Sequence, residues 1–110
     1  MLCTEEVIQE VWEKGVITTN NDPRIWRQDD CGAWIARSGY GRQESPFSWE
    51  INYIHSQTQK GGHHLSNLRP MQWQNNIHKQ DGDLVCLFKA VGVKNCNIVP
   101  AAPLTATGKN

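Results

Sequence analysis

The stretch that decides the fold runs from residue 49 to residue 82 and reads WEINYIHSQTQKGGHHLSNLRPMQWQNNIHKQDG. Aromatic and β-branched side chains are frequent in residues 47–55 and alternate there with polar ones, which predicts a strand. Residues 56–66 are mostly polar and include a pair of glycines, so we expect an exposed loop. Apolar side chains then fall on one side of residues 71–79, which predicts a short helix. The order is therefore strand, loop, helix.

The flanking segments extend this pattern. Thr4 is suited to cap a helix and two glutamates follow it, which predicts an amphipathic helix of about three turns ending before Gly15. Residues 22–27 begin with Asp-Pro and predict a short helical turn, whereas residues 31–35 predict a strand or the edge of one. We expect an α+β fold with an N-terminal helix, a two-stranded ribbon with a helix packed on it, and a short C-terminal extension.

Length and composition limit the organisation. The 110 residues, 38% of them hydrophobic and five of them tryptophan, suit one domain with most tryptophans in its core. We assign residues 1–83 to this domain and residues 84–110 to a C-terminal extension with a flexible end. No apolar run approaches the roughly 20 residues that cross a bilayer, and the first ten residues lack the features of a signal peptide. We expect a cytoplasmic protein with no membrane partner.

The charge distribution restricts contacts with nucleic acid. The formal net charge is zero, which disfavours a strong non-specific grip on DNA. Residues 1–23 hold five acidic residues against one lysine, whereas residues 24–80 hold seven basic residues against four acidic ones and all four histidines. Any phosphate contact is therefore expected in the middle segment, although ordinary solvated charges explain the same counts. The candidates there are Arg37, Arg42, Lys60 and Arg69.

The cysteines indicate no structural zinc site. They stand at positions 3, 31, 86 and 96, and no CxxC pair occurs. In a cytoplasmic chain we expect them to be reduced, whereas an exported chain with this even number would allow two disulfides.

Several words of residues 49–82, in the right order, resemble those of small HNH endonuclease-like proteins. In that family Trp-Glu-(apolar)-Asp-His-Ile opens the motif, a Gly-Gly loop follows, and Asn-Leu-(Arg/Gln)-Pro leads to a helix with a final His or Asn. The upstream words VWEKG and DPRIWRQDDCGAWIARSGYG are similar to the segment before the motif, so the resemblance covers about residues 7–83. It implies the ββα-metal fold.

The resemblance also implies a site. In the family the strand His is the general base, and the neighbouring Asp and a helix residue bind one divalent cation that stabilises charge on the phosphate. The motif places Asn52 at the Asp position, Tyr53 at the His position, Asn67 at the middle Asn and Asn76 at the helix ligand. Lys79 follows as a basic residue for nucleic acid.

Two of these positions depart from the family. Asn52 offers a neutral carbonyl where a hard cation favours a carboxylate, so we expect no cofactor beyond weakly held Mg²⁺ or Mn²⁺ at Asn52 and Asn76. A tyrosine has an ordinary pKa near 10, against about 6.5 for histidine, so Tyr53 is a poor base at neutral pH. His55 is a possible substitute base, but it lies about 6–7 Å further along the strand. Asn67 also has a structural reading, in which its side chain ties the loop to the strand.

These features predict a catalytically degenerate HNH nuclease-like protein that acts by binding. Its target is DNA or RNA, or else a protein partner such as a nuclease-containing defence complex, against which it would serve as inhibitor or decoy in phage or mobile-element conflict. The alternative is an active, metal-dependent HNH DNA endonuclease with an atypical site.

Overall fold

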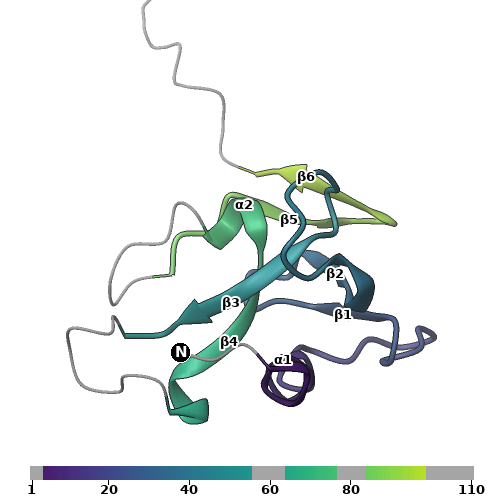
Figure 1. Ribbon diagram of the computed structural model, residues 1–110. Helices are drawn as coiled ribbons and strands as arrows, with labels where there is room; N and C mark the ends of the chain where they lie inside the picture. Colours follow the sequence, from purple (N-terminus) through teal and green to yellow (C-terminus); the bar gives the residue numbers. More distant parts are fainter. Residues whose placement is uncertain (1–3, 56–63, 77–83, 99–110) are drawn as a thin grey trace, which may run out of the picture.

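Small antiparallel hairpins and one longer helix form an α+β fold in a computed structural model, which describes residues 4–55, 64–76 and 84–98 (Figure 1). The elements in chain order are α1 (Glu5–Trp12), β1 (Trp26–Gln28), β2 (Trp34–Ala36), the 3-10 turn η1 (Arg37–Gly39), β3 (Trp49–Tyr53), the 3-10 turn η2 (Leu65–Asn67), β4 (Leu68–Gln72), α2 (Trp73–Asn76), β5 (Phe88–Val91) and β6 (Lys94–Asn97). Strand β1 pairs with β2, β3 with β4 and β5 with β6.

Helix α1 begins as the sequence predicts. The Thr4 hydroxyl accepts a hydrogen bond from the Val7 backbone N–H at 3.2 Å, and both acidic residues of the first turn lie at the positive end of the helix. The helix has eight residues and so about two turns, which makes the prediction of three turns wrong. The chain leaves the helix just before Gly15, where an added Cβ would lie 3.1 Å from the Arg27 side chain.

The core lies between α1 and the β3–β4 hairpin. It consists of the buried residues Ile8, Val11, Trp12, Ile35, Trp49 and Leu68. The rings of Trp12 and Trp49, both fully buried, lie 5.4 Å apart between centroids and supply much of the apolar area. The other tryptophans, Trp26, Trp34 and Trp73, are only partly buried. Fully buried core positions are thus held by two of the five tryptophans, fewer than the expected majority.

The β3–β4 hairpin and α2 position the candidate site. Strand β3 confirms the strand predicted for residues 47–55, and its register pairs Asn52 with Arg69. The helix predicted for residues 71–79 begins later than expected, because Met71 and Gln72 continue β4 and α2 starts at Trp73. Its predicted end, with Lys79, lies outside the described residues. Ladder hydrogen bonds to β3 thus override the helical spacing of the apolar side chains.

The first hairpin differs from its prediction too. Asp22 and Pro23 do begin a turn, in which the Ile25 and Trp26 backbone N–H groups donate to the Asp22 carbonyl. Trp26, however, starts strand β1 and pairs with Ala36 of β2, so the helical turn over residues 22–27 is wrong in its second half. The partly buried faces of these aromatic strands favour pairing over helix.

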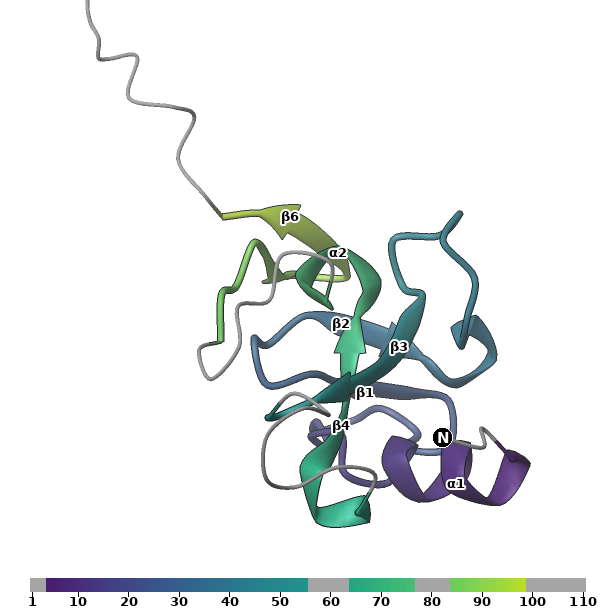
Figure 2. The same cartoon turned by 60° about the vertical axis from the view of Figure 1, so that its left-hand side comes forward.

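The β5–β6 hairpin lies at the opposite end of the molecule from α1, as Figures 1 and 2 show. It belongs to the segment that the sequence assigns to a C-terminal extension. The Asn95 side chain holds it to β2, since Oδ1 accepts from the Trp34 backbone N–H at 2.6 Å and Nδ2 donates to the Trp34 carbonyl at 2.8 Å. The predicted flexible end lies outside the described residues. Within the described part of the chain, no helix has the length and apolar character needed to cross a bilayer.

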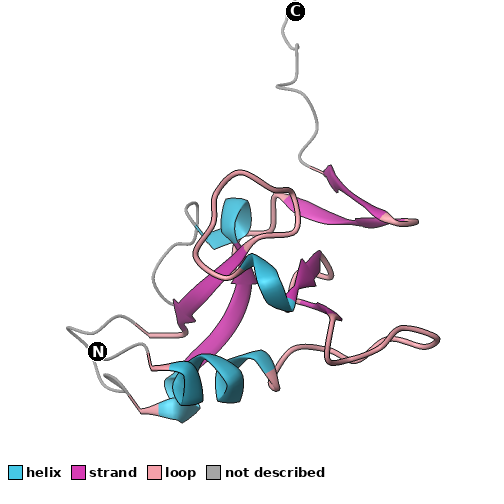
Figure 3. Ribbon diagram, turned by 45° about the vertical axis from the view of Figure 1, so that its right-hand side comes forward, coloured by secondary structure: helices cyan, strands magenta, loops and turns pink. Residues whose placement is uncertain are grey.

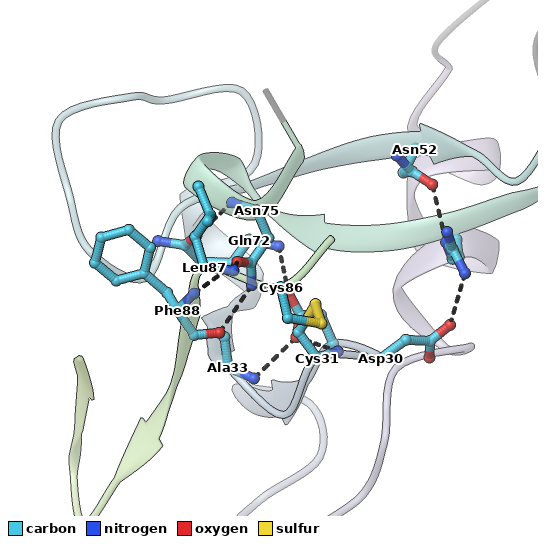
Figure 4. Close-up of a disulfide and its surroundings, with 11 residues drawn as sticks. Asp30, Cys31, Ala33, Asn52, Gln72, Asn75, Cys86, Leu87 and Phe88 are labelled. Atoms are coloured by element: carbon cyan, nitrogen blue, oxygen red, sulfur yellow. Dashed lines mark hydrogen bonds and ion pairs between the residues drawn. A yellow bond between two sulfur atoms is a disulfide. The ribbon is translucent and has the colours of Figure 1, made fainter. Parts of the chain in front are cut away.

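A disulfide joins the body to the segment before β5. Cys31 and Cys86 are bonded, with Cα atoms 5.5 Å apart and a sequence separation of 55 (Figure 4). The prediction that the cysteines stay reduced is therefore wrong for this pair. Local spacing reveals zinc motifs, but it does not reveal two cysteines that only the fold brings together. Cys96 is free and exposed.

Candidate functional site

The two candidate metal-ligand positions meet in the structure. Asn52 on β3 and Asn76 on α2 are 24 residues apart in sequence, and Asn52 Nδ2 donates to Asn76 Oδ1 at 2.8 Å. Arg69, opposite Asn52 on β4, donates from Nε to Asn52 Oδ1 at 2.8 Å. Both side-chain oxygens that a cation would need thus accept hydrogen bonds from within the protein. Asn52 is 3% exposed, so little water competes for these bonds.

Charged groups close both ends of this chain of bonds. Arg69 also forms an ion pair with Asp30 at 3.3 Å, and Figure 4 shows Asn52 and Asp30 on either side of the guanidinium. At the other end, Asn76 Nδ2 donates to Glu50 Oε1 at 3.2 Å. We call Asp30, Arg69, Asn52, Asn76 and Glu50 the amide network. It occupies the position where the resemblance to HNH proteins places a metal.

Tyr53, which the sequence resemblance sets at the position of the base, has a packing role in the structure. Tyr53 follows Asn52 on β3, so its side chain leaves the opposite face of the strand, and it packs against the hydrophobic core. His55, the possible substitute base, is exposed just beyond the end of β3. The structure therefore separates Tyr53 from the amide network and leaves His55 open to solvent.

Asn67 has the structural role that its sequence position suggests. Its side-chain oxygen accepts from the His55 backbone N–H and its amide donates to the His55 carbonyl, both at 2.9 Å. Asn67 is 4% exposed, so these bonds are sheltered. The prediction that this side chain ties the loop to the strand is confirmed, because the Asn67 amide bonds both backbone groups of His55, the residue just before the 56–66 segment.

Several predicted phosphate contacts are already engaged. The Arg37 side chain donates to Gln9 Oε1 at 2.8 Å and pairs with Glu5 at 3.3 Å, both on α1. Arg69 belongs to the amide network, and only 15% of its side chain is exposed. Arg42 is 62% exposed and lies 4.0 Å from Glu44. Lys60 and Lys79 lie outside the described residues.

Asp29 is a buried anchor that the sequence reading missed. It is 1% exposed, and its carboxylate accepts four hydrogen bonds. The backbone N–H groups of Cys31 and Ala33 donate to Oδ1, whereas the Gln72 backbone N–H and the Asn75 side chain donate to Oδ2. Burial raises the pKa of Asp29, and these four donors oppose the rise. Its bond to the N–H two residues on is an Asx-type turn, a local signal that could have revealed it.

Asn75 is a second missed anchor, shown beside Asp29's donors in Figure 4. It is fully buried, and its side chain completes its bonding, with Oδ1 accepting from the Leu87 and Phe88 N–H groups at 2.8 Å and Nδ2 donating to Asp29 and to the Phe88 carbonyl. The helical spacing of residues 71–79 sets Asn75 among the polar positions, away from the apolar side. The structure places it inward instead, because strand β5 covers that side.

No group of three or more His, Cys, Asp or Glu side chains gathers in residues 4–55, 64–76 and 84–98. The chain matches none of the protein-family models, curated proteins or solved structures with which it was compared.

Proposed function

We propose that this protein is a catalytically degenerate HNH nuclease-like protein that acts by binding a partner. The order β3, loop, β4, α2 agrees with the ββα-metal arrangement. It brings Asn52 and Asn76, the positions of the family ligands, into contact at 2.8 Å. The assignment to the ββα-metal fold is part of the proposal and rests on this order and on the sequence words.

The observation that carries the loss of catalysis is the use of both ligand oxygens inside the amide network. Asn52 Oδ1 already accepts from Arg69, and Asn76 Oδ1 already accepts from Asn52. Mg²⁺ or Mn²⁺ would have to share these oxygens with their present donors or displace the donors, and would then lie beside a fixed positive charge. Oxygen ligands hold hard cations best when they carry negative charge, and neither amide does. The binding of a cation is therefore disfavoured twice.

A protein partner suits the surface better than nucleic acid does. Two of the basic side chains predicted to contact phosphates make internal contacts instead, Arg37 with α1 and Arg69 within the amide network. Lys14 donates to the backbone carbonyls of Leu65 and Leu68, and burial lowers its pKa. Counterion release from phosphates needs free cationic groups, and these three side chains are already engaged within the described part of the chain. A nuclease-containing complex of a defence system is the class of partner that we propose.

The test of degeneracy is a nicking assay on supercoiled plasmid with Mg²⁺ or Mn²⁺. The parent is compared with Asn52→Asp, with Tyr53→His and with the double variant, each checked for folding by circular dichroism. We expect the parent and both single variants to be inactive and the double variant to nick. A ligand without a base leaves water unactivated, and a base without a cation leaves the phosphate charge unneutralised. Adding Arg69→Gln should strengthen Mn²⁺ binding in calorimetry, because a positive charge leaves the site.

Two outcomes would contradict the proposal. If the parent nicks and Tyr53→Ala leaves the rate unchanged, the chain is an active nuclease, and His55→Ala then shows whether the exposed histidine is the base. If the parent binds Mn²⁺ at micromolar concentration, the amide network is not closed to cations.

A further inference from the structure

A cavity lined by two tryptophans lies between the β1–β2 and β5–β6 hairpins. It has a volume of about 180 Å³ and is lined by Asn21, Trp26, Trp34 and Val93. Figure 3 shows the loop between α1 and β1 and the turn of the β5–β6 hairpin projecting to the same side of the molecule. Asn21 comes from the first and Val93 from the second, so the two projections form the walls. We call these four residues the tryptophan groove.

The groove presents aromatic surface at a fixed angle. The rings of Trp26 and Trp34 stand nearly perpendicular, at 79° with centroids 6.3 Å apart. Trp34 Nε1 donates to the Gly92 carbonyl at 2.7 Å, which holds its ring against the hairpin turn. Phe47 supports Trp26 from behind with centroids 5.1 Å apart. Because both rings are held by neighbours, the groove is formed before anything binds.

The groove also offers a donor and an apolar rim. In the part of the chain that the structure describes, the Trp26 indole N–H has no hydrogen-bond acceptor. Its nitrogen is not fully buried. Val93 is 82% exposed at the edge. Aromatic walls with an indole donor are the chemistry that recognises a polyproline II segment, in which proline rings pack on aromatic faces and backbone carbonyls accept hydrogen bonds.

The chain itself carries such a segment. Residues 99–104 read VPAAPL, in which Pro100 and Pro103 have the PxxP spacing. Three residues make one turn of polyproline II, so the two prolines fall on the same side of the segment. We propose that the tryptophan groove binds the Pro100–Pro103 segment of a second copy of this chain. This inference goes beyond the proposed function and does not depend on it.

The geometry of β6 excludes the same copy as the source. Val93 lies in the groove, whereas Ile98 is still paired, through its N–H, to the Leu87 carbonyl at the far end of the hairpin. Five extended residues span about 16 Å. Pro100 is two residues beyond Ile98 and can return only about 7 Å. A chain therefore cannot place both of its own prolines in its own groove, but a second copy can.

The test measures self-association of the full chain by sedimentation velocity up to about 1 mM, a range suited to weak peptide recognition. Every sample carries Cys96→Ser, so that an intermolecular disulfide does not imitate association. The groove variant is Val93→Asp and the tail variant is Pro100→Ala with Pro103→Ala. The matched control is Val91→Asp, because Val91 is also exposed on this hairpin, at 58%, but does not line the groove.

We expect the parent and the Val91→Asp control to associate with increasing concentration. The groove and tail variants should each associate at least tenfold more weakly. Mixed together, these two variants should form a heterodimer, because one retains the tail and the other retains the groove. A synthetic peptide of residues 99–110 should shift the Trp26 indole NMR signal of the parent but not that of Val93→Asp. The inference is overturned if the parent stays monomeric and the peptide shifts no indole signal, or if Val93→Asp associates and binds the peptide as the parent does.

Discussion

Opening the Cys31–Cys86 disulfide should cost the fold much of its stability. The bond joins two residues that are 55 apart in sequence. A cross-link over a loop of that length lowers the chain entropy of the unfolded state, which stabilises the folded protein by about 4 kcal/mol at 25 °C. Domains of this size unfold with about 5–15 kcal/mol in total. If the total stability lies at the low end of that range, the protein without the bond is close to unfolding.

The assay is equilibrium unfolding in urea, followed by tryptophan fluorescence, with and without a phosphine reductant. The variant Cys31→Ser with Cys86→Ser should match the reduced parent. With a slope of about 1.5 kcal/mol per molar urea, the midpoint should fall by about 2–3 M. The control is Cys96→Ser, which removes an exposed free thiol and should leave the midpoint unchanged.

The reasoning is refuted if oxidised protein yields no linked Cys31–Cys86 peptide, or if the double variant loses less than about 1 kcal/mol, a quarter of the predicted value. The same peptide map bears on the compartment. Thiols of a cytoplasmic protein are kept reduced, so the linked peptide in protein alkylated inside its own cells would contradict the cytoplasmic expectation.

Three further predictions concern single side chains and salt. Asp29→Asn should lower the free energy of unfolding by about 2–4 kcal/mol, because its new NH₂ group faces two buried N–H donors. The neighbouring variant Asp30→Asn should lower it by under about 1 kcal/mol, and urea unfolding measures both values. Asn67→Ala should cost about 1–3 kcal/mol and speed amide exchange at the end of β3, which hydrogen-exchange mass spectrometry detects. Duplex DNA should bind weakly and dissociate by about 0.3 M salt in fluorescence anisotropy, and submicromolar binding there would contradict this prediction.

Local signals predicted the parts of the fold that depend on neighbours in sequence. The Thr4 cap needs only the following turn, and the β3 strand shows in the alternation of residues 49–53. That the Asn67 side chain ties the loop to the strand was one of two readings from the sequence, because an asparagine in a loop commonly bonds nearby backbone, and the structure supplies His55 as the partner. The order of sequence words placed Asn52 and Asn76 at one site, and the structure brings them into contact.

Contacts between distant segments were beyond such signals. Asn75 was expected among the polar positions of the helix because helical spacing says nothing of Leu87 and Phe88, which arrive twelve and thirteen residues later and need its amide. The Cys31–Cys86 pair likewise depends on the closing of the hairpin onto the body. The start of α2 shifted for the same reason, since Met71 pairs with Glu50 of β3. Tertiary pairing decides these positions, and residue spacing does not record it.

The direction of the hydrogen bonds explains why position 52 holds an amide. Arg69 donates to Asn52, Asn52 donates to Asn76, and Asn76 donates to Glu50, so donation runs without interruption from a cation to a carboxylate. Such chains strengthen their own members by polarisation. A carboxylate at position 52 would accept from Arg69 equally well, but it has no hydrogen to give Asn76. Unless a cation lay between the two oxygens, the Asn76 amide would have to turn over and present its Nδ2 to position 52, which would leave its oxygen facing the Glu50 carboxylate. The amide network needs a donor where a metal site needs a charge, so position 52 can serve one of them and not both.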